Sequence, residues 1–213
     1  MKSIKNKYSV GSLFSGVGGF ELGFKKAGYQ TLWAVENDQH ASATYKLNFK
    51  NKLIQKDITK ISKKEISSLD SVDVLTAGFP CQAFSIAGYQ KGFEDPRGNL
   101  FLEILRFVRT LENKPKVLLL DEPAAGLGAD DVTVLLKGLR KFVDEQNLCL
   151  VIIEHDLELV TSICPIIYVL HFGRIISEGS AEVITSDPTV IEAYLGKGYA
   201  PESNDGEGGS DAV

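Results

Sequence analysis

Short apolar runs alternate with amphipathic stretches along most of the 213-residue chain. Unbroken apolar runs that end in glycine or in an acidic residue are typical of strands buried on both faces of a parallel sheet. Two further strands, "IIYVLHFG" and "RIISEG", are expected around a Phe-Gly turn near the end of the chain. The six expected earlier strands cover residues 9–16, 30–38, 52–58, 73–80, 116–122 and 148–156.

This alternation predicts an α/β fold with a single doubly wound, mostly parallel, Rossmann-like sheet flanked by helices. The expected strand order is 3-2-1-4-5-6-7, with "RIISEG" as an antiparallel edge strand beside "IIYVLHFG". One α/β domain is expected over residues 1–197, with halves at 1–117 and 118–197. The polar, acidic and glycine-rich residues 198–213 are predicted to be a disordered tail.

Composition places the protein among ordinary globular chains, with 44% hydrophobic and 24% charged residues. No apolar run approaches the roughly 18 residues that a membrane span needs. The first ten residues lack the apolar core of a signal peptide, and the three cysteines have no metal-type spacing. These features predict a cytoplasmic protein without a metal site, and none of them indicates a protein partner.

The net charge of −5 conceals a step along the chain. Residues 1–118 hold 18 Lys and Arg against 11 Asp and Glu, whereas residues 119–201 hold 5 against 13. A basic front half suits a polyanion such as DNA. The alternative interpretation is that surface charge simply varies along the chain.

Polar residues follow the first three expected strands at the edge where doubly wound sheets bind ligands. Gly16 and Gly18 lie where a strand turns into a helix, a geometry that serves a ligand-binding turn or a purely structural tight turn. Glu36 ends the second strand, where it could accept hydrogen bonds from a ribose or simply be a solvated acid. Asp57 ends the third strand.

Cys81 follows the fourth expected strand, between Pro80 and Gln82. A free cysteine is often only a small buried hydrophobic residue. At a strand end on the same edge as the glycine turn, however, it has the position of a nucleophile.

Residues 10–117 resemble the DNA (cytosine-5)-methyltransferases in four ordered motifs, including "LFSGVGGFELGF" and Pro-Cys-Gln. The resemblance implies that Cys81 adds to C6 of a cytosine flipped out of the duplex, and that S-adenosylmethionine is the methyl donor. The residues that the resemblance assigns to the cofactor are Phe14, Gly16, Gly18, Glu36, Asp57 and Pro80.

The sequence departs from this family at the end of the fifth strand. Where the family has Glu-Asn-Val, this chain has Asp121, Glu122 and Pro123, so Asp121 takes the place of the glutamate that contacts cytosine N3. No later methyltransferase motif follows, and the target-recognition segment is among those missing.

Residues 116–196 instead resemble the ATP-binding subunits of ABC transporters of the branched-chain amino-acid type, through "VLLLDEPAAGL" and "LVIIEHDLELV". The resemblance implies that Asp121 is the magnesium-side acid, Glu122 the base that orients water, and His155 the switch histidine. Because no Gly-Lys-Ser or Gly-Lys-Thr phosphate loop occurs in the sequence, we expect neither ATP nor magnesium to bind.

The sequence therefore has the form of a chimera, joined within a strand that both families share. It predicts a truncated methyltransferase-like protein with Cys81 and Asp121 as catalytic residues, weak or lost binding of S-adenosylmethionine, and little turnover. Two alternatives stay open: an ABC-type ATPase fragment that lacks its phosphate loop, and a catalytically inactive chimeric α/β scaffold.

Overall fold

The computed structural model describes residues 8–78 and 99–195 and divides the chain into two compact units, residues 1–155 and 156–213. Each unit has a hydrophobic core of its own. The predicted extent of a single domain, residues 1–197, and the predicted tail at 198–213 stay predictions.

The first unit contains a six-stranded sheet with the order β3-β2-β1-β4-β5-β6. Every neighbouring pair in this sheet is parallel, as the apolar runs predicted. The doubly wound, Rossmann-like sheet and the order of its six strands are therefore confirmed. The strands are β1 (Ser9–Leu13), β2 (Gln30–Glu36), β3 (Lys52–Gln55), β4 (Val74–Ala77), β5 (Val117–Asp121) and β6 (Cys149–Ile153).

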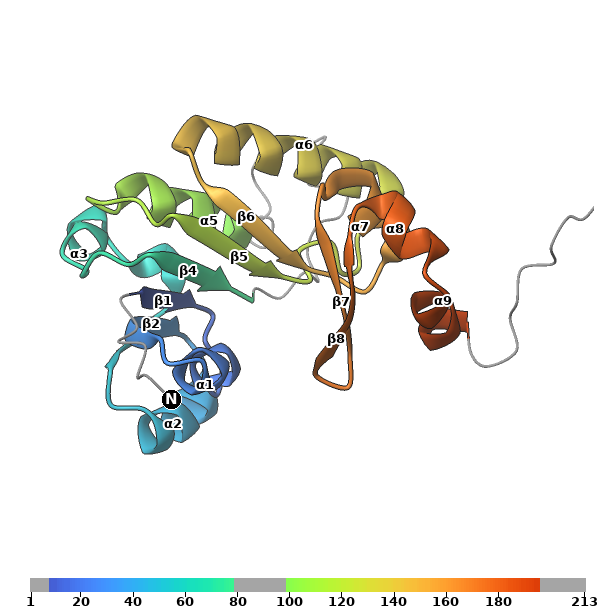
Figure 1. Cartoon of the computed structure of the whole chain (residues 1–213). Helices are drawn as coiled ribbons and strands as arrows, with labels where there is room; N and C mark the ends of the chain where they lie inside the picture. Colours follow the sequence, from blue (N-terminus) through green and yellow to red (C-terminus); the bar gives the residue numbers. More distant parts are fainter. Residues whose placement is uncertain (1–7, 79–98, 196–213) are drawn as a thin grey trace, which may run out of the picture. The chain divides into compact units, whose positions relative to one another are not determined.

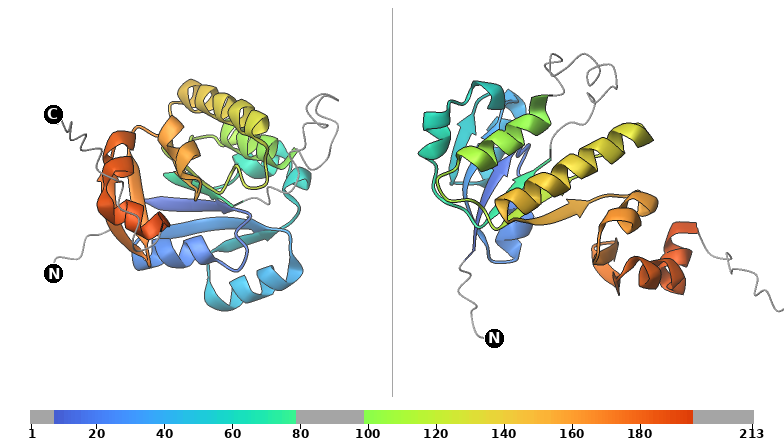
Figure 2. Two further views of the ribbon diagram at one scale, coloured as in Figure 1. Left: turned by 90° about the vertical axis from the view of Figure 1, so that its right-hand side faces the viewer. Right: turned by 90° about the horizontal axis from the view of Figure 1, so that it is seen from above.

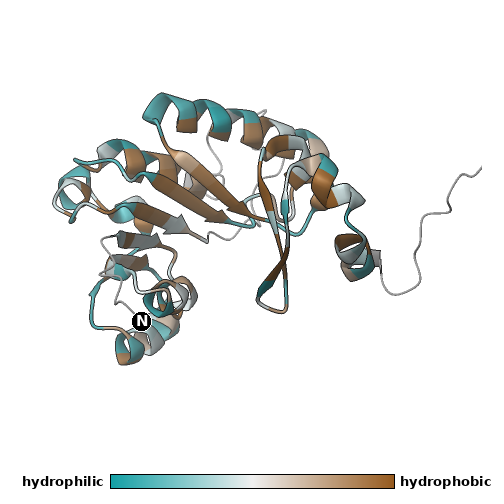
Figure 3. Ribbon diagram, in the orientation of Figure 1, coloured by the Kyte–Doolittle hydropathy of each residue, from teal (hydrophilic) through white to brown (hydrophobic). Residues whose placement is uncertain are grey.

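Helices cover both faces of the sheet, with α1 and α2 on one face and α3, α5 and α6 on the other (Figures 1 and 2). Figure 3 shows hydrophobic colouring concentrated on β4, β5 and β6, whereas the helices carry hydrophilic turns on their outer sides. The helices of this unit are α1 (Gly19–Lys26), α2 (Gln39–Asn48), the 3₁₀ helix η1 (Ile58–Lys60), α3 (Lys63–Ser67), α5 (Asn99–Thr110) and α6 (Ala129–Gln146).

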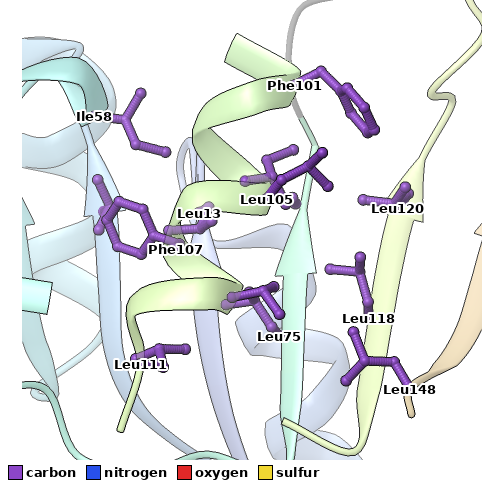
Figure 4. Close-up of a cluster of buried hydrophobic side chains, with 14 of the residues drawn as sticks. Leu13, Ile58, Leu75, Phe101, Leu105, Phe107, Leu111, Leu118, Leu120 and Leu148 are labelled. Atoms are coloured by element: carbon purple, nitrogen blue, oxygen red, sulfur yellow. The ribbon is translucent and has the colours of Figure 1, made fainter. Parts of the chain in front are cut away.

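Strand β5 contains the predicted join between the methyltransferase-like and the ABC-like parts of the sequence. It pairs with β4 on one side and with β6 on the other. Its Leu118 and Leu120 are fully buried in a core shared with Leu75 of β4 and Leu139 of α6. Each such leucine contributes about 1.5–3 kcal/mol through burial. Figure 4 shows α5 packed over this cluster, so the prediction of a sheet that continues across the join is confirmed.

The second unit consists of α7 (Leu157–Ile163), β7 (Ile167–His171), β8 (Arg174–Gly179), α8 (Ala181–Ser186) and α9 (Pro188–Leu195). Strands β7 and β8 form an antiparallel hairpin through Phe172 and Gly173, both with positive φ. The predicted antiparallel pairing is therefore confirmed.

The predicted place of β7 as the seventh strand of the large sheet is wrong, because β7 and β8 form a sheet of their own. The reason lies in the burial pattern of β7. Ile167 and Val169 are buried against Ile184 of α8 and Val190 of α9, whereas Tyr168 and the other alternate positions are exposed. A strand buried on one face suits a hairpin covered by helices, not the interior of a parallel sheet.

Candidate functional site

The turn between β1 and α1 has a backbone that few residue types adopt. Phe14, Gly16 and Gly18 have φ angles of 56°, 55° and 98°. The turn is closed by hydrogen bonds from the Ser15 N–H to the Val35 carbonyl (3.1 Å) and from the Gly18 N–H to the Ser15 carbonyl (3.0 Å). Positive φ at two glycines lets the chain reverse tightly before α1 begins.

The two glycines of this turn differ in what surrounds them. A Cβ atom at Gly18 would overlap the ring of Phe49, so packing alone requires glycine there. At Gly16, no atom of the described residues would lie within 4 Å of a Cβ atom. Packing therefore accounts for the glycine at position 18, whereas the space beside Gly16 is open.

Glu36, at the carboxyl end of β2, fixes this turn with both of its carboxylate oxygens. Oε2 accepts a hydrogen bond from the Gly16 N–H, and Oε1 accepts one from the Asp38 N–H, each at 2.7 Å. Hydrogen bonds to a charged acceptor are shorter and stronger than neutral ones. The carboxylate is thus held in a fixed orientation beside Gly16, and its role toward a cofactor stays a prediction.

Asp57 lies at the end of β3 and caps η1. Its Oδ1 accepts hydrogen bonds from the Thr59 hydroxyl (2.8 Å) and the Thr59 N–H (2.9 Å). These bonds, first the hydroxyl and then the backbone, hold the pKa of Asp57 below its usual value. A local structural role therefore accounts for Asp57 in the structure, beside its predicted role toward the cofactor.

Asp121 ends β5 next to the point where β4 leads into the nucleophile segment. A Cβ atom at Gly78 would lie 3.7 Å from Asp121 Cβ and 3.8 Å from its Oδ2. Burial, followed by the charge of Glu122, raises the pKa of the Asp121 carboxyl. The predicted residues Pro80 and Cys81 lie outside the described residues.

Glu122 and His155, the other two ATPase-like residues, lie together where β5 and β6 end. The His155 Nδ1 atom is 3.3 Å from Glu122 Oε1, and both side chains are more than half exposed. Behind them, the side chain of Glu154 is only 2% exposed, and its Oε1 accepts a hydrogen bond from the Ala124 N–H at 2.9 Å.

The sequence did not predict that the side chains of two acids, Glu154 and Glu21, are buried. Through its hydrogen bond from the Ala124 N–H, Glu154 connects the turn after β5 to the end of β6. The sequence feature that could have identified this role is an acid directly after an apolar strand. Glu21 is 1% exposed in the first turn of α1, where an acid is ordinarily a surface residue. Among the described residues, no three His, Cys, Asp or Glu side chains come close enough to hold a metal ion.

Comparison with known proteins bears directly on the glycine turn and the strand ends around it. The model of the C-5 cytosine-specific DNA methylase family matches residues 8–134, more than half of the chain. The chain belongs to this family. The methylase match runs through β5 and into the start of α6, past the point where the motif comparison put the join.

Type II methyltransferases of bacteria are similar to the same region. M.Bsp6I of Bacillus sp. (strain RFL6) is 48% identical over 124 residues, which cover 57% of this chain and 38% of that protein. M.HhaI of Haemophilus parahaemolyticus is 46% identical over 125 residues, which cover 57% of this chain and 36% of that protein. The present chain thus spans little more than a third of the length of each of these relatives.

Among solved structures, the Dnmt2 methyltransferase of S. pombe covers 62% of this chain with 25% identity and a TM-score of 0.49, over 42% of its own length. A second family model, that of the branched-chain amino acid ATP-binding cassette transporter, matches residues 174–200. Both predicted resemblances are therefore confirmed, the second over a short segment that begins with β8. Within the described residues, no helix has the length and apolar character to cross a membrane.

Proposed function

We propose that residues 8–134 are the cofactor-binding and nucleophile-bearing part of an S-adenosylmethionine-dependent DNA cytosine-5 methyltransferase. The observation that carries this proposal is the Glu36 carboxylate, held at 2.7 Å by the Gly16 and Asp38 N–H groups beside an open glycine. A carboxylate has about four lone-pair sites, so each oxygen keeps the capacity to accept a ribose hydroxyl.

In this proposal the cofactor lies along the carboxyl ends of β1, β2 and β3. Phe14 and Gly16 lie against it, Gly18 fixes the turn, Glu36 accepts from its ribose, and Asp57 faces its adenine. S-adenosylmethionine supplies the methyl group as an electrophile. The open backbone at Gly16 and the anchored Glu36 fit such a ligand because both are formed before it binds. Pro80 borders the same site in the proposal.

The proposed nucleophile is Cys81. Its thiolate forms a bond to C6 of a cytosine taken out of the duplex, which makes C5 nucleophilic toward the methyl group. C5 would take the methyl group as the donor's carbon–sulfur bond breaks and S-adenosylhomocysteine leaves. A base then removes the C5 proton, the C6–sulfur bond breaks, and the Cys81 thiolate is regenerated. Sulfur suits both steps because a thiolate adds readily and leaves readily.

Turnover by this chain is proposed to be low. Asp121 stands where the family has glutamate, so its carboxyl group is one methylene short of the position needed to contact cytosine N3. A misplacement of about 1 Å can cost on the order of 10²-fold in rate. The raised pKa of Asp121 works in the opposite direction, because a protonated carboxyl can donate the required hydrogen bond to N3.

DNA is the proposed macromolecular partner, bound through the basic residues of the front half. Residues 1–118 carry 18 basic against 11 acidic residues, which supports loose phosphate contacts. Such contacts weaken steeply as salt is raised.

A second candidate is an ABC-type ATPase fragment, so that the chain as a whole is a chimera of two families. The observation in its favour is the contact of His155 Nδ1 with Glu122 Oε1 at 3.3 Å, at adjacent strand ends. The absence of a Gly-Lys-Ser or Gly-Lys-Thr loop from the sequence counts against nucleotide binding. A third candidate is a folded scaffold that binds neither ligand.

The test is incubation of the full 213-residue chain with DNA that contains 5-fluorocytosine, in the presence of S-adenosylmethionine. Because fluorine at C5 cannot leave as a proton does, an active Cys81 is trapped as a covalent protein–DNA adduct. We expect a slow adduct that is lost in Cys81→Ser and retained in the surface control His155→Ala. The absence of an adduct from folded protein would leave the scaffold as the better account.

A further inference from the structure

Glu21 is an ionisable residue that the proposed chemistry does not use. It is the third residue of α1, immediately after the glycine turn, and it is 1% exposed. Within the described residues, neither of its carboxyl oxygens has a partner in hydrogen-bonding geometry. A buried carboxyl group without such a partner needs a physical explanation.

The groups around Glu21 are hydroxyls from two other elements. Ser12 of β1 and Tyr45 of α2 lie beside the carboxyl group, and both are fully buried. The Ser12 Oγ accepts a hydrogen bond from the Thr76 hydroxyl at 3.1 Å, and the Tyr45 hydroxyl accepts one from Asn51 Nδ2 at 2.9 Å. Each of the two hydroxyls beside Glu21 is therefore paired elsewhere, that of Ser12 with Thr76 of β4 and that of Tyr45 with the amide of Asn51 before β3.

No positive charge compensates Glu21 among the described residues that act on it. The charged group that acts on its carboxyl is Glu36, which has the same sign. Burial, more than any other cause, raises the pKa of Glu21, and the Ser12 and Tyr45 hydroxyls oppose this rise. An ionised carboxylate in such a place loses its hydration without gaining a counter-ion, so the neutral acid is the favoured form.

We propose that Glu21 is a neutral carboxylic acid in the folded protein and acts as a pH-dependent latch: α1 and the glycine turn stay packed against β1 while the carboxyl group is neutral, and they loosen when it ionises. An ionised Glu21 would be driven toward water and would repel Glu36, which anchors the Gly16 N–H. The effect of the latch on the cofactor rests on the proposed function, whereas the protonation state of Glu21 does not.

The sign of the pH dependence follows from the raised pKa. The stability that Glu21 contributes is fully present below its unfolded pKa, near 4.5, and is lost as the pH rises through the folded pKa. Each unit by which the pKa is raised corresponds to a tenfold change in the folding equilibrium. The titratable groups that face Glu21 are Glu36 from β2 and Tyr45 from α2.

The first test is a titration of the side-chain carboxyl ¹³C resonances of the full chain, with Glu21→Gln to assign the signal. The expected midpoint for Glu21 lies above 4.5, and Tyr45→Phe should move it further up because that change removes a hydroxyl that lowers the pKa. Glu65, whose pKa is lowered to about 2, is the internal control in the same spectra. A Glu21 midpoint at or below 4.5 would overturn the latch.

The second test measures S-adenosylmethionine affinity by calorimetry on both sides of the midpoint that the carboxyl titration gives for Glu21. The wild-type affinity is expected to fall as the pH rises, whereas that of Glu21→Gln, which is neutral and of nearly equal shape, stays level. Parallel profiles for the two proteins would refute the link to the cofactor. If neither protein binds at any pH, the proposed function fails, and the carboxyl titration still decides the protonation state of Glu21.

Discussion

Two groups of polar residues lie at the carboxyl edge of the same six-stranded sheet, and they are held in different ways. At one, the Glu36 carboxylate is fixed by two backbone N–H groups at 2.7 Å. At the other, Glu122 meets His155 at 3.3 Å through side chains that are 52% and 74% exposed. Backbone donors cannot rotate away, whereas two exposed side chains can, so the first acceptor keeps a fixed orientation and the second does not.

The methylase match covers both Glu36 and Glu122 and leaves out only His155, so the match does not by itself separate the two groups. A shared edge of a parallel sheet is a general place for ligands, so position alone does not assign a function. The proposal for the Glu36 site therefore rests on how this acid is anchored and not on its position alone.

The largest expected effect comes from the turn that supports Glu36. Gly18→Ala should lower the free energy of unfolding by about 2–4 kcal/mol, because it adds a clash with Phe49 to a positive φ. Gly16→Ala, with the same kind of φ but open space, is the matched control and should cost only about 1–2 kcal/mol. Chemical denaturation measures both, and equal losses would show that the two glycines are not distinct.

A smaller effect should separate the two acids themselves. Glu36→Gln should destabilise the protein by about 1.5–3 kcal/mol, since the amide NH₂ faces one of the two N–H donors. It should also weaken S-adenosylmethionine binding by about tenfold or more.

Glu122→Gln is the counterpart at the second group of residues. An exposed pair contributes about 0–1 kcal/mol, so this change should leave both stability and cofactor affinity nearly unaltered. Chemical denaturation measures the stability of the two variants, and calorimetry measures their affinity for S-adenosylmethionine. An effect of Glu122→Gln as large as that of Glu36→Gln would contradict the contrast between the two acids.

The smallest expected effect is at acidic pH. Lys56 and then Ser62 hold the pKa of Glu65 down to about 2 through hydrogen bonds to its carboxylate. The stability from Glu65 is present above its unfolded pKa near 4.5 and is lost as the pH falls toward about 2. In unfolding profiles, Glu65→Gln should flatten this acidic limb and leave the loss at higher pH untouched, whereas Glu21→Gln should do the reverse.

Much of the first unit could be predicted from sequence because its signals are local. Apolar runs such as "KVLLLDE" indicate strands buried on both faces, and their alternation with helices fixes a parallel order. Strand β7 was misplaced because "IIYVLHFG" has the same composition as a buried strand. The tertiary packing shows the difference: Ile167 and Val169 of β7 pack against α8 and α9, whereas the alternate residues Tyr168 and Leu170 are exposed.

The positions of the strand-end acids were predictable from the sequence, but their hydrogen bonds were not. Glu36 and Asp57 stand out as strand-end acids, yet the sequence does not show that one anchors a turn and the other caps η1. Glu21 could not be predicted as a core residue, since the helix spacing of "FELGFKKAG" leaves open which side of α1 faces Ser12 and Tyr45. Such facts depend on tertiary packing.

The most direct test of the central claim is calorimetry of the full chain with two ligands, S-adenosylmethionine and magnesium-ATP. The account predicts a measurable heat with S-adenosylmethionine that is weakened in Glu36→Gln, and no heat with magnesium-ATP. Binding of magnesium-ATP without binding of S-adenosylmethionine would contradict it, because the preorganised acceptor at Gly16 and Glu36 would then have no ligand while the exposed Glu122–His155 pair had one.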